Sequence, residues 1–514
     1  MNDARHEDAS TSRTVLRRED GRFVTGRGRY TDDINIPGQA YVMFVRSDHA
    51  HGELLSIDMA EASRQPGVLR VFTGDDLTRA GVGFIHRLPL KGFDLGQTLD
   101  TPRPGLAQSR VRYVGEPIAM VVAETAAQAG DAAAMVGVNI APLPAVVDVE
   151  HAIDSGAPVI WPEAPDNVAI RWQSGDPAAV DEVFAGAAHV TRLKLVNTRI
   201  FANPIEPRTS IAQYDAAADR FTWITPSQGV RYMVRVLCDQ VFKIPDEQMR
   251  VLTYDVGGAF GSKEQPYPED VALLHAARVL GRPVKWQGTR SENLLSDNHA
   301  RDAVIDCALA LDADGQFLAL RAHILASMGA YFGCNGPNGS IRNTPWGLPL
   351  VYRTPLVHAQ VTAAMTNAAP IGPYRGAGRE QASYIVERLV EEAARQMKID
   401  RVELRRRNLI PATAIPYQTP SGRLYDSGAF EAVMDKTLHL SDWSGFAARA
   451  ASSAKRGLIR GQGIANFLEC VGGSWHEGSH IRFTKEGRVL LVVATQSHGQ
   501  GHETSFPQVV ADRL

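Results

Sequence analysis

The chain has 514 residues, 44% of them apolar and 22% charged, a composition that excludes a disordered chain and a coiled coil. Its net charge of −3 leaves no basic excess, so neither nucleic acid nor an anionic membrane is an expected partner. The cysteines form no CxxC pair, so we expect no iron–sulfur cluster or zinc ribbon in this chain. No secretory signal is visible and no apolar run reaches the ~20 residues of a membrane span, which predicts a cytoplasmic protein.

The first part of the chain has the pattern of a mixed α/β domain. Residues 1–20 are polar and predict a mobile lead-in to a domain over residues 21–150. Apolar runs predict strands and an alanine-rich stretch predicts a helix. The expected strands are residues 40–46, 68–72, 117–123 and 146–149, and the expected helix is 125–136. Repeated Pro, Gly and Asp then predict a linker over residues 151–180.

The rest of the chain predicts larger units with both helices and strands, over residues 181–410 and 411–514. Alternating residues on both sides of 312–315 predict a hairpin. Two more expected hairpins each run into a glutamine-bearing loop, at Gln228 and Gln500, which suggests two related subdomains. Three helices are expected: one begins at Pro268, one covers residues 380–397, and one follows a cap at Asp400.

The segment from His476 to His480 spells HExxH, a zinc motif in which Glu477 would be the base. The motif works only on a helix, where residues i and i+4 share a face. Glycine and serine surround this segment and a strand is expected at 481–484. A polar loop is therefore the favoured interpretation, and a zinc-dependent hydrolase is the alternative. His498 and His502 have the same spacing, but Gly499 and Gly501 again favour a loop.

Three further loops are candidates for ligand contacts. Gly257–Lys263 is glycine-rich without being a Walker A loop, and either lets backbone N–H groups approach a ligand or forms a tight turn beneath Phe260. Gly372–Arg379 precedes a helix, and Arg375 either polarises an oxygen at that helix end or caps neighbouring carbonyls. Ser497–Glu503 either binds a polar, phosphate-bearing cofactor or is a plain turn.

Taken in chain order, these segments resemble the large, molybdenum-binding subunit of the xanthine dehydrogenase / aldehyde oxidase family, in its carbon-monoxide-dehydrogenase-like branch. The likeness begins with Arg18–Asp33 and Val45–His51 and continues through Tyr113–Pro117, Glu206–Arg208 and the loops above. It covers nearly the whole chain. The resemblance implies an α+β fold class, with an N-terminal α/β hammerhead domain followed by molybdopterin-binding α+β domains, the last of them incomplete.

The resemblance also implies a chemistry. Members of the family bind molybdenum on a pterin dithiolene, in bacteria often as the cytosine dinucleotide, and hydroxylate an aldehyde or an N-heterocycle with oxygen from water. Electrons leave through iron–sulfur clusters and FAD on partner subunits. The implied partners are an iron–sulfur small subunit, an FAD medium subunit and a small-molecule substrate.

The resemblance assigns roles residue by residue. Gln228 matches the glutamine that hydrogen-bonds an oxygen ligand of the metal, and Arg375 matches the arginine that faces substrate. Glu264 is a candidate carboxylate of the substrate pocket. No side chain is assigned as a metal ligand. The loops that match the metal-facing and pterin-binding segments supply the cofactor-binding candidates Gly258, Phe260, Gly261, Gly499, Gln500 and Gly501.

The loop after Tyr374-Arg375 departs from two branches of the family. Carbon monoxide dehydrogenases carry a cysteine there, whereas Gly376, Ala377 and Gly378 follow in this chain. We therefore expect an organic substrate. Ala377 also occupies the place of the stacking phenylalanine of purine-using relatives, which weakens a xanthine assignment.

The second departure concerns the general base of the family, a glutamate in a Gly-x-Gly-Glu segment downstream of the Gln500 loop. The sequence reaches Leu514 before any such segment. We therefore expect a shortened form or one half of a split large subunit, with a separate chain carrying the rest, and no turnover by this chain alone. A non-catalytic assembly module that retains the fold is the remaining alternative.

Overall fold

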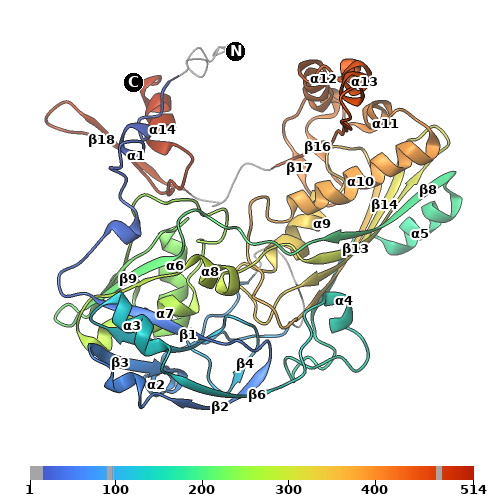
Figure 1. The fold of residues 1–514 in the computed structure, drawn as a ribbon. Helices are drawn as coiled ribbons and strands as arrows, with labels where there is room; N and C mark the ends of the chain where they lie inside the picture. The colour runs from blue at the N-terminus through green and yellow to red at the C-terminus, as the bar shows by residue number, and fades with distance from the viewer. Residues whose placement is uncertain (1–14, 90–94, 96–97, 470–476) are drawn as a thin grey trace.

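The computed structural model describes residues 15–89, 95, 98–469 and 477–514. Helices and strands are mixed along the whole of this range (Figure 1). The blue N-terminal strands lie on one side of the molecule, and the orange helices of residues 379–454 lie on the other (Figure 1). No helix in the described ranges is long and apolar enough to cross a membrane.

The N-terminal region is built on buried strands. β1 (Ala40–Arg46) and β3 (Val68–Thr73) pair antiparallel with β5 (Pro117–Ala123), whose seven residues are all buried. α3 (Ala126–Ala133) packs on β1 and β5. The strands β4, β2 and β6 form a separate small sheet. The remaining elements are α1 (Asp20–Phe23), β2 (Gly52–Asp58), α2 (Gly74–Arg79), β4 (Arg110–Val111), β6 (Gly137–Pro142) and α4 (Val149–Ala152).

The local predictions in this region have different outcomes. The strands expected at residues 40–46 and 117–123 are confirmed as β1 and β5 with the same bounds. The strand expected at 146–149 is wrong. The Asp148 carboxylate accepts the N–H groups of Glu150 (2.8 Å) and His151 (3.2 Å) and thereby caps α4 at Val149.

One sheet joins the N-terminal region to the middle of the chain. Its strand order is β11-β10-β9-β12-β1-β5-β3. β1 lies parallel to β12, with Ala40 opposite Val284 and Tyr41 opposite Lys285. The sheet therefore spans both the expected hammerhead range and the range after it. The later elements of this layer are β9 (Thr209–Asp215), β10 (Arg220–Ile224), α6 (Val230–Val236), β11 (Met249–Leu252), α7 (Pro268–Leu280) and β12 (Val284–Gln287).

α7 is the buried helix of this layer and has clear start and stop signals. Pro268 occupies its first turn, and the Asp270 carboxylate accepts the N–H of Tyr267 (2.9 Å). Gly281 ends the helix with a φ of +64°. Residues 268–277 are all buried, because α7 packs against the strands β9, β12 and β5.

The second large sheet has the strand order β7-β15-β14-β13-β8. The predicted hairpin around residues 312–315 is confirmed as β13 and β14. α10 packs on one face of this sheet and α5 on the other. β7 lies within the range expected as a linker. The elements are β7 (Val168–Ser174), α5 (Pro177–Gly186), β8 (His189–Asn197), β13 (Ala303–Leu311), β14 (Phe317–Ser327), β15 (Leu356–Ala364) and α10 (Arg379–Met397).

Short elements complete the fold. The hairpin β18–β19 and α14 lie beside the N-terminal α1, away from α12 and α13 (Figure 1). These elements are α8 (Arg290–Ser296), α9 (Thr344–Gly347), α11 (Arg401–Asn408), β16 (Tyr417–Gln418), β17 (Leu424–Tyr425), α12 (Phe430–Leu440), α13 (Phe446–Ala454), β18 (Ser479–Phe483), β19 (Val489–Val493) and α14 (His502–Ala511).

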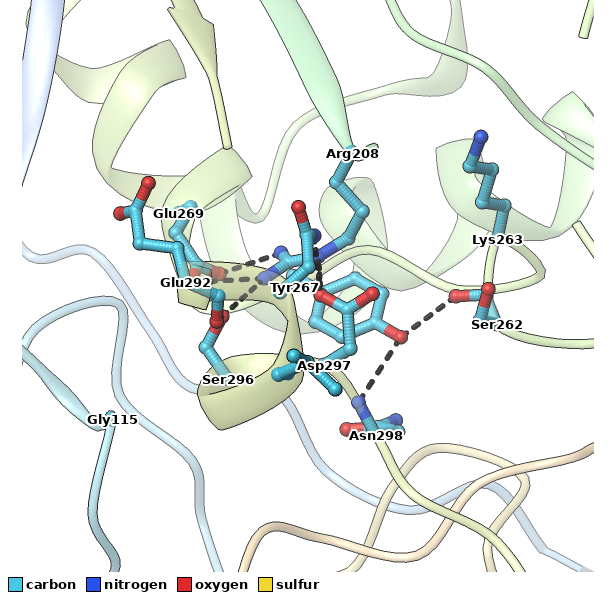
Figure 2. Close-up of polar contacts among 12 residues, drawn as sticks. Gly115, Arg208, Ser262, Lys263, Tyr267, Glu269, Glu292, Ser296, Asp297 and Asn298 are labelled. Atoms are coloured by element: carbon cyan, nitrogen blue, oxygen red, sulfur yellow. Dashed lines mark hydrogen bonds and ion pairs between the residues drawn. The ribbon is translucent and has the colours of Figure 1, made fainter. Parts of the chain in front are cut away.

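A buried network of charges lies between the two regions that the first sheet joins (Figure 2). The Arg208 guanidinium donates to both oxygens of Glu269 (2.9 and 3.1 Å) and to Asp297. Arg46, at the end of β1, donates to Glu269 (2.8 Å) and to Glu292 (2.9 Å). Two cations thus share one buried carboxylate, and the network connects β1 to α7 and α8.

Candidate active site

Gln228 lies in the loop between β10 and α6 and is fixed against a neighbouring loop. Its N–H donates to the carbonyl of Lys263 (3.0 Å), and its side-chain oxygen accepts the N–H of Gly261 (2.7 Å). The side-chain oxygen is thereby occupied. The Nε2 group of Gln228 faces the ring of His498 at 3.5 Å and remains a donor at the edge of a cavity.

The neighbouring loop, residues 257–263, is called the glycine loop below. Its backbone is left-handed at Gly258 (φ +93°), Phe260 (φ +54°) and Gly261 (φ +105°). A Cβ atom at Gly261 would lie 2.4 Å from the carbonyl oxygen of Pro373. A side chain there would push two backbones apart, so the sequence needs glycine at this position. Phe260 keeps a left-handed backbone and is 39% exposed at the cavity.

Hydrogen bonds with buried polar groups fix the position of the glycine loop. The Lys263 ammonium donates to the side chain (3.0 Å) and the carbonyl (2.8 Å) of Glu206, and the same carboxylate accepts the N–H of Gly257 (2.8 Å). Burial lowers the pKa of Lys263, while the attraction of Glu206 opposes this shift. The Tyr267 hydroxyl donates to the carbonyl of Ser262 (2.7 Å), as Figure 2 shows. Both ends of the loop therefore have a fixed position.

Arg375 lies in a second loop, residues 372–378, called the arginine loop. Its N–H donates to the carbonyl of Phe260 (2.9 Å), and its carbonyl accepts a bond from Arg301 (3.1 Å). Arg301 also forms an ion pair with Glu380, whose carboxylate accepts the N–H of Gly378 (3.0 Å) at the start of α10. The backbone of Arg375 is thus fixed on both sides. Its exposed guanidinium makes no hydrogen bond or ion pair with a described residue.

The third loop, residues 496–501, is called the Gln500 loop and is organised around His498. The Nδ1 of His498 lies 3.2 Å from the carbonyl of Gln496, so this nitrogen carries the proton and Nε2 accepts. The Gln500 side chain accepts the N–H of His498 (2.7 Å) and places its Nε2 3.1 Å from the ring. Burial lowers the pKa of His498, which keeps the ring neutral. His498 therefore connects Gln500 to Gln228.

These loops converge on a cavity of about 540 Å³, called the site cavity. It brings together seven of the residues proposed from the sequence. Gly258 lines instead a second cavity of about 760 Å³, which shares Phe260, His498 and Gly499 with the first. Gly501 lines neither and precedes α14 with a φ of +74°. The predicted residues around the site cavity are Gln228, Phe260, Gly261, Glu264, Arg375, Gly499 and Gln500.

Glu264 is the acidic group of the site cavity. The Nδ2 of Asn335 donates to its carboxylate (3.1 Å), and no cation is paired with it among the described residues. Burial raises the pKa of Glu264 to about 7. This carboxyl group can therefore gain or lose a proton near neutral pH.

Sequence reasoning did not nominate His498, Pro373 or Tyr374, all of which line the site cavity. The signal for His498 was its place between the glutamines and glycines of the Gln500 loop. Its role became visible only through Gln228, which is 270 positions away in sequence. The carbonyl of Pro373 lies against Gly261, a backbone contact for which residue type gives no signal, and the ring of Tyr374 packs under the Arg301 guanidinium.

The HExxH alternative depends on a helix. His476 lies outside the described residues. Glu477 and Gly478 are not helical, and His480 lies in the strand β18. The loop interpretation therefore holds for the described part of the motif, and no group of three or more potential metal-binding side chains is found among the described residues.

Three family models match the chain. The molybdopterin cofactor-binding domain matches residues 160–409 and, in a second model, residues 436–514. The aldehyde oxidase and xanthine dehydrogenase a/b hammerhead domain matches residues 25–144. The chain belongs to the xanthine dehydrogenase / aldehyde oxidase family. The expected fold class, a hammerhead domain followed by molybdopterin-binding domains, is confirmed.

Three relatives within this family are about a third identical to the chain over the aligned residues. The nicotine 6-hydroxylase large subunit of Paenarthrobacter nicotinovorans is 35% identical over 97% of this chain and 62% of its own length. The carbon monoxide dehydrogenase large chain of Afipia carboxidovorans is 33% identical over 96% and 64%. Among solved structures, quinoline 2-oxidoreductase from Pseudomonas putida 86 has a TM-score of 0.90 and 33% identity over 97% and 64%. The chain thus spans less than two thirds of these relatives.

The residues of the site cavity fit the cofactor that the family models name. Arg375 presents a guanidinium that is unpaired among the described residues, Gln228 has a side-chain N–H beyond the one that faces His498, and the glycine loop brings backbone close to the cavity. Oxygen-rich, anionic groups are recognised by such donors.

Proposed function

We propose that this chain is a large-subunit portion of a molybdenum hydroxylase that oxidises an aldehyde or an N-heterocycle with water as the oxygen source. Electrons would pass to iron–sulfur and FAD partner subunits. One observation carries the proposal: loops that are far apart in sequence, at Gln228, Phe260, Arg375 and Gln500, meet around one cavity. Such convergence of polar groups is typical of a ligand site, not of independent turns.

Each loop has a separate task in this proposal. Bound molybdenum–pterin supplies a metal centre that activates an oxygen from water and accepts electrons from the substrate. Gln228, held by Gly261, directs its amide donor at the cofactor. Gln500 and His498 hold the loop on the other side. Arg375 orients the substrate and stabilises negative charge that develops on it.

Glu264 supports an organic substrate in this proposal. A carboxyl group with a pKa of about 7 can accept a hydrogen bond from a ring N–H or donate one to a ring nitrogen or a carbonyl. Ala377, beside Arg375, also lines the cavity and leaves more room than a large side chain would. No cysteine lines the cavity within the described residues, so we expect no oxidation of carbon monoxide.

The second cavity supports a phosphate-bearing form of the pterin, such as the cytosine dinucleotide. It opens beside the site cavity, and Arg17 and Arg29 line it together with Arg22, whose guanidinium is already paired with Asp255 and Glu503. Arginine recognises phosphate through paired N–H donors.

Metal analysis of the purified complex with its partner subunits tests the function. We expect about one molybdenum and organic phosphate per chain, and no turnover after molybdenum is removed. Arg375→Met should lower kcat/KM at least ~100-fold while molybdenum content stays unchanged. Arg353→Met, which changes an exposed arginine outside the cavity, is the matched control.

Two results would contradict the proposed function. Substrate oxidation by a preparation that contains no molybdenum would exclude it. A complex that binds no molybdenum at all would favour the assembly module instead.

A further inference from the structure

The N-terminal segment, residues 17–30, touches the last helix of the chain. We call this segment the N-terminal strap. Glu19 is only 3% exposed, although it belongs to the range expected to be mobile. Its carboxylate accepts the N–H of Glu503 (2.9 Å) and the hydroxyl of Thr504 (2.5 Å) at the first turn of α14. Figure 1 shows the blue α1 beside the red α14.

The contact between Glu19 and α14 is chemically well matched. A carboxylate near a helix N-terminus satisfies free N–H groups and interacts favourably with the helix dipole. The Arg18 N–H also donates to the Thr504 hydroxyl (2.8 Å). Burial alone would raise the pKa of Glu19, but hydrogen bonds from Thr504 and from backbone N–H groups lower it overall. The strap thus supplies the cap that α14 lacks locally, because Gly501 has no side chain.

Arg22 joins the strap both to the first turn of α14 and to the segment that precedes the glycine loop. Its guanidinium donates to both oxygens of Glu503 (2.7 and 2.8 Å) and to both oxygens of Asp255 (2.6 and 3.3 Å). The N–H of Asp255 also donates to the carbonyl of Arg29 (3.1 Å), and the Asp255 carboxylate accepts the Arg29 N–H (2.8 Å). A planar guanidinium with two carboxylates fixes both of them in one geometry.

The two carboxylates stand next to the loops of the site. Asp255 lies three residues before Gly258 in the lead into the glycine loop, and Glu503 lies three residues after Gln500. The strap also forms a wall of the second cavity, through Arg17, Glu19 and Arg22. A shift of the strap would therefore move the glycine loop and the Gln500 loop relative to each other.

We propose that Glu19 and Arg22 are positioning residues that hold the glycine loop and the Gln500 loop at a fixed separation around the shared edge of the two cavities. The consequence of this positioning role for cofactor retention rests on the proposed function, whereas its effect on the order of the two loops does not. The Gln500 loop then depends on a segment more than 470 positions away in sequence.

Hydrogen–deuterium exchange on the full chain tests loop order. Glu19→Ala and Arg22→Met should each speed exchange of the amides of residues 498–504 at least tenfold, and Arg22→Lys should give a smaller increase. Exchange in α7 and in β13–β14 should not change. Asp20→Asn is the matched control, because Asp20 lies in the same turn and, among the described residues, forms an ion pair only with Arg17, at 3.6 Å on the surface.

A variant on the α14 side of the contact keeps the test decisive if Glu19→Ala or Arg22→Met fails to fold. Thr504→Val removes from the α14 side the hydroxyl that donates to Glu19, and it should reproduce the local increase. Unchanged exchange over 498–504 in Glu19→Ala, Arg22→Met and Thr504→Val would overturn the proposal. An increase spread evenly over the whole chain would overturn it too, since that result indicates a general loss of stability.

Molybdenum retention in the complex with partner subunits tests the consequence for the site. After dialysis, Glu19→Ala and Arg22→Met should keep less than half of the molybdenum that the unchanged chain and Asp20→Asn keep. Full retention in both variants would overturn the positioning role toward the cofactor. If the unchanged complex binds no molybdenum, the proposed function fails, and the exchange experiment still decides whether the strap orders the loops.

Discussion

Glu264 illustrates how a single residue can acquire properties that its type does not predict. It follows Lys263 directly, yet Lys263 is neutralised by Glu206 whereas Glu264 has only the amide of Asn335 as a described partner. Without a cation nearby, burial dominates and raises the pKa of Glu264 to about 7. Lys263 and Glu264 are adjacent and both largely removed from solvent, but only Lys263 has a described partner of opposite charge, so only Glu264 has a pKa near neutrality.

This pKa predicts a pH dependence of stability. A carboxyl group with a pKa above that of the unfolded chain binds its proton more tightly in the folded state. The free energy of unfolding should therefore fall as the pH rises from about 4.5 to 7, by ~3 kcal/mol at most. Glu264→Gln should remove this fall and stabilise the chain above pH 7. Urea denaturation from pH 4.5 to 8 measures it.

An exposed carboxylate provides the comparison for Glu264. Glu163→Gln changes a surface residue and should leave the pH dependence as it is in the unchanged chain. Parallel stability curves for the unchanged chain and Glu264→Gln would show that the carboxyl group is not strongly perturbed.

At the scale of elements, the glycine loop and the arginine loop form one unit because their backbones touch. The contact is the N–H of Arg375 on the carbonyl of Phe260 (2.9 Å), with Gly261 against Pro373. Neither loop has a helix or strand of its own at this point. Their geometry depends on left-handed residues and on side chains such as Gln228 that bind the backbone.

Gly261→Ala should therefore separate the two loops. The new Cβ would lie 2.4 Å from the Pro373 carbonyl, and a φ of +105° is strained for alanine. We expect a loss of more than ~2 kcal/mol in the free energy of unfolding, and loss of the Gln228 contact. Gly186→Ala is the control, because nothing lies within 4 Å of its Cβ position. Chemical denaturation in which both variants behaved alike would contradict the close approach.

The fold and the site differ in how far the sequence predicts them. β1, β5 and the β13–β14 hairpin follow from local runs and turns, and the structure confirms them. The parallel pairing of β1 with β12 joins residues about 240 positions apart, and no local pattern encodes it. The resemblance named the loops of the site, whereas the contact of His498 with Gln228 required the folded chain.

At the scale of the whole molecule, the buried charge network connects the regions that the first sheet joins. Arg46 comes from β1, whereas Glu269 and Arg208 come from the middle of the chain. Burial alone would raise the pKa of Glu269, but Arg208 and Arg46 hold it well below its usual range. The Arg208 guanidinium also stacks on Tyr267, whose hydroxyl holds the glycine loop. The network therefore connects domain packing to the site.

Glu269→Gln should destabilise the whole chain, since it leaves two buried guanidinium groups without their shared anion. We expect a loss of ~3 kcal/mol or more in the free energy of unfolding. Because a depressed pKa contributes stability above the unfolded value of about 4.5, the loss should be constant between pH 5 and 8 and should shrink as the pH falls below 4.5. Urea denaturation at several pH values measures both effects, with Glu163→Gln as the control.

A double-mutant cycle distinguishes a shared network from two separate sites. Arg46→Met removes one of the two cations that are paired with Glu269. The free energy of unfolding of the double variant Arg46→Met/Glu269→Gln should therefore fall by at least ~1 kcal/mol less than the sum of the two single losses. The residual cost should come from Arg208, which keeps Asp297 as a partner. Additive losses would mean that Arg46 and Glu269 stabilise the chain independently, and the first sheet and the hydrophobic core beneath it would then hold the two regions together.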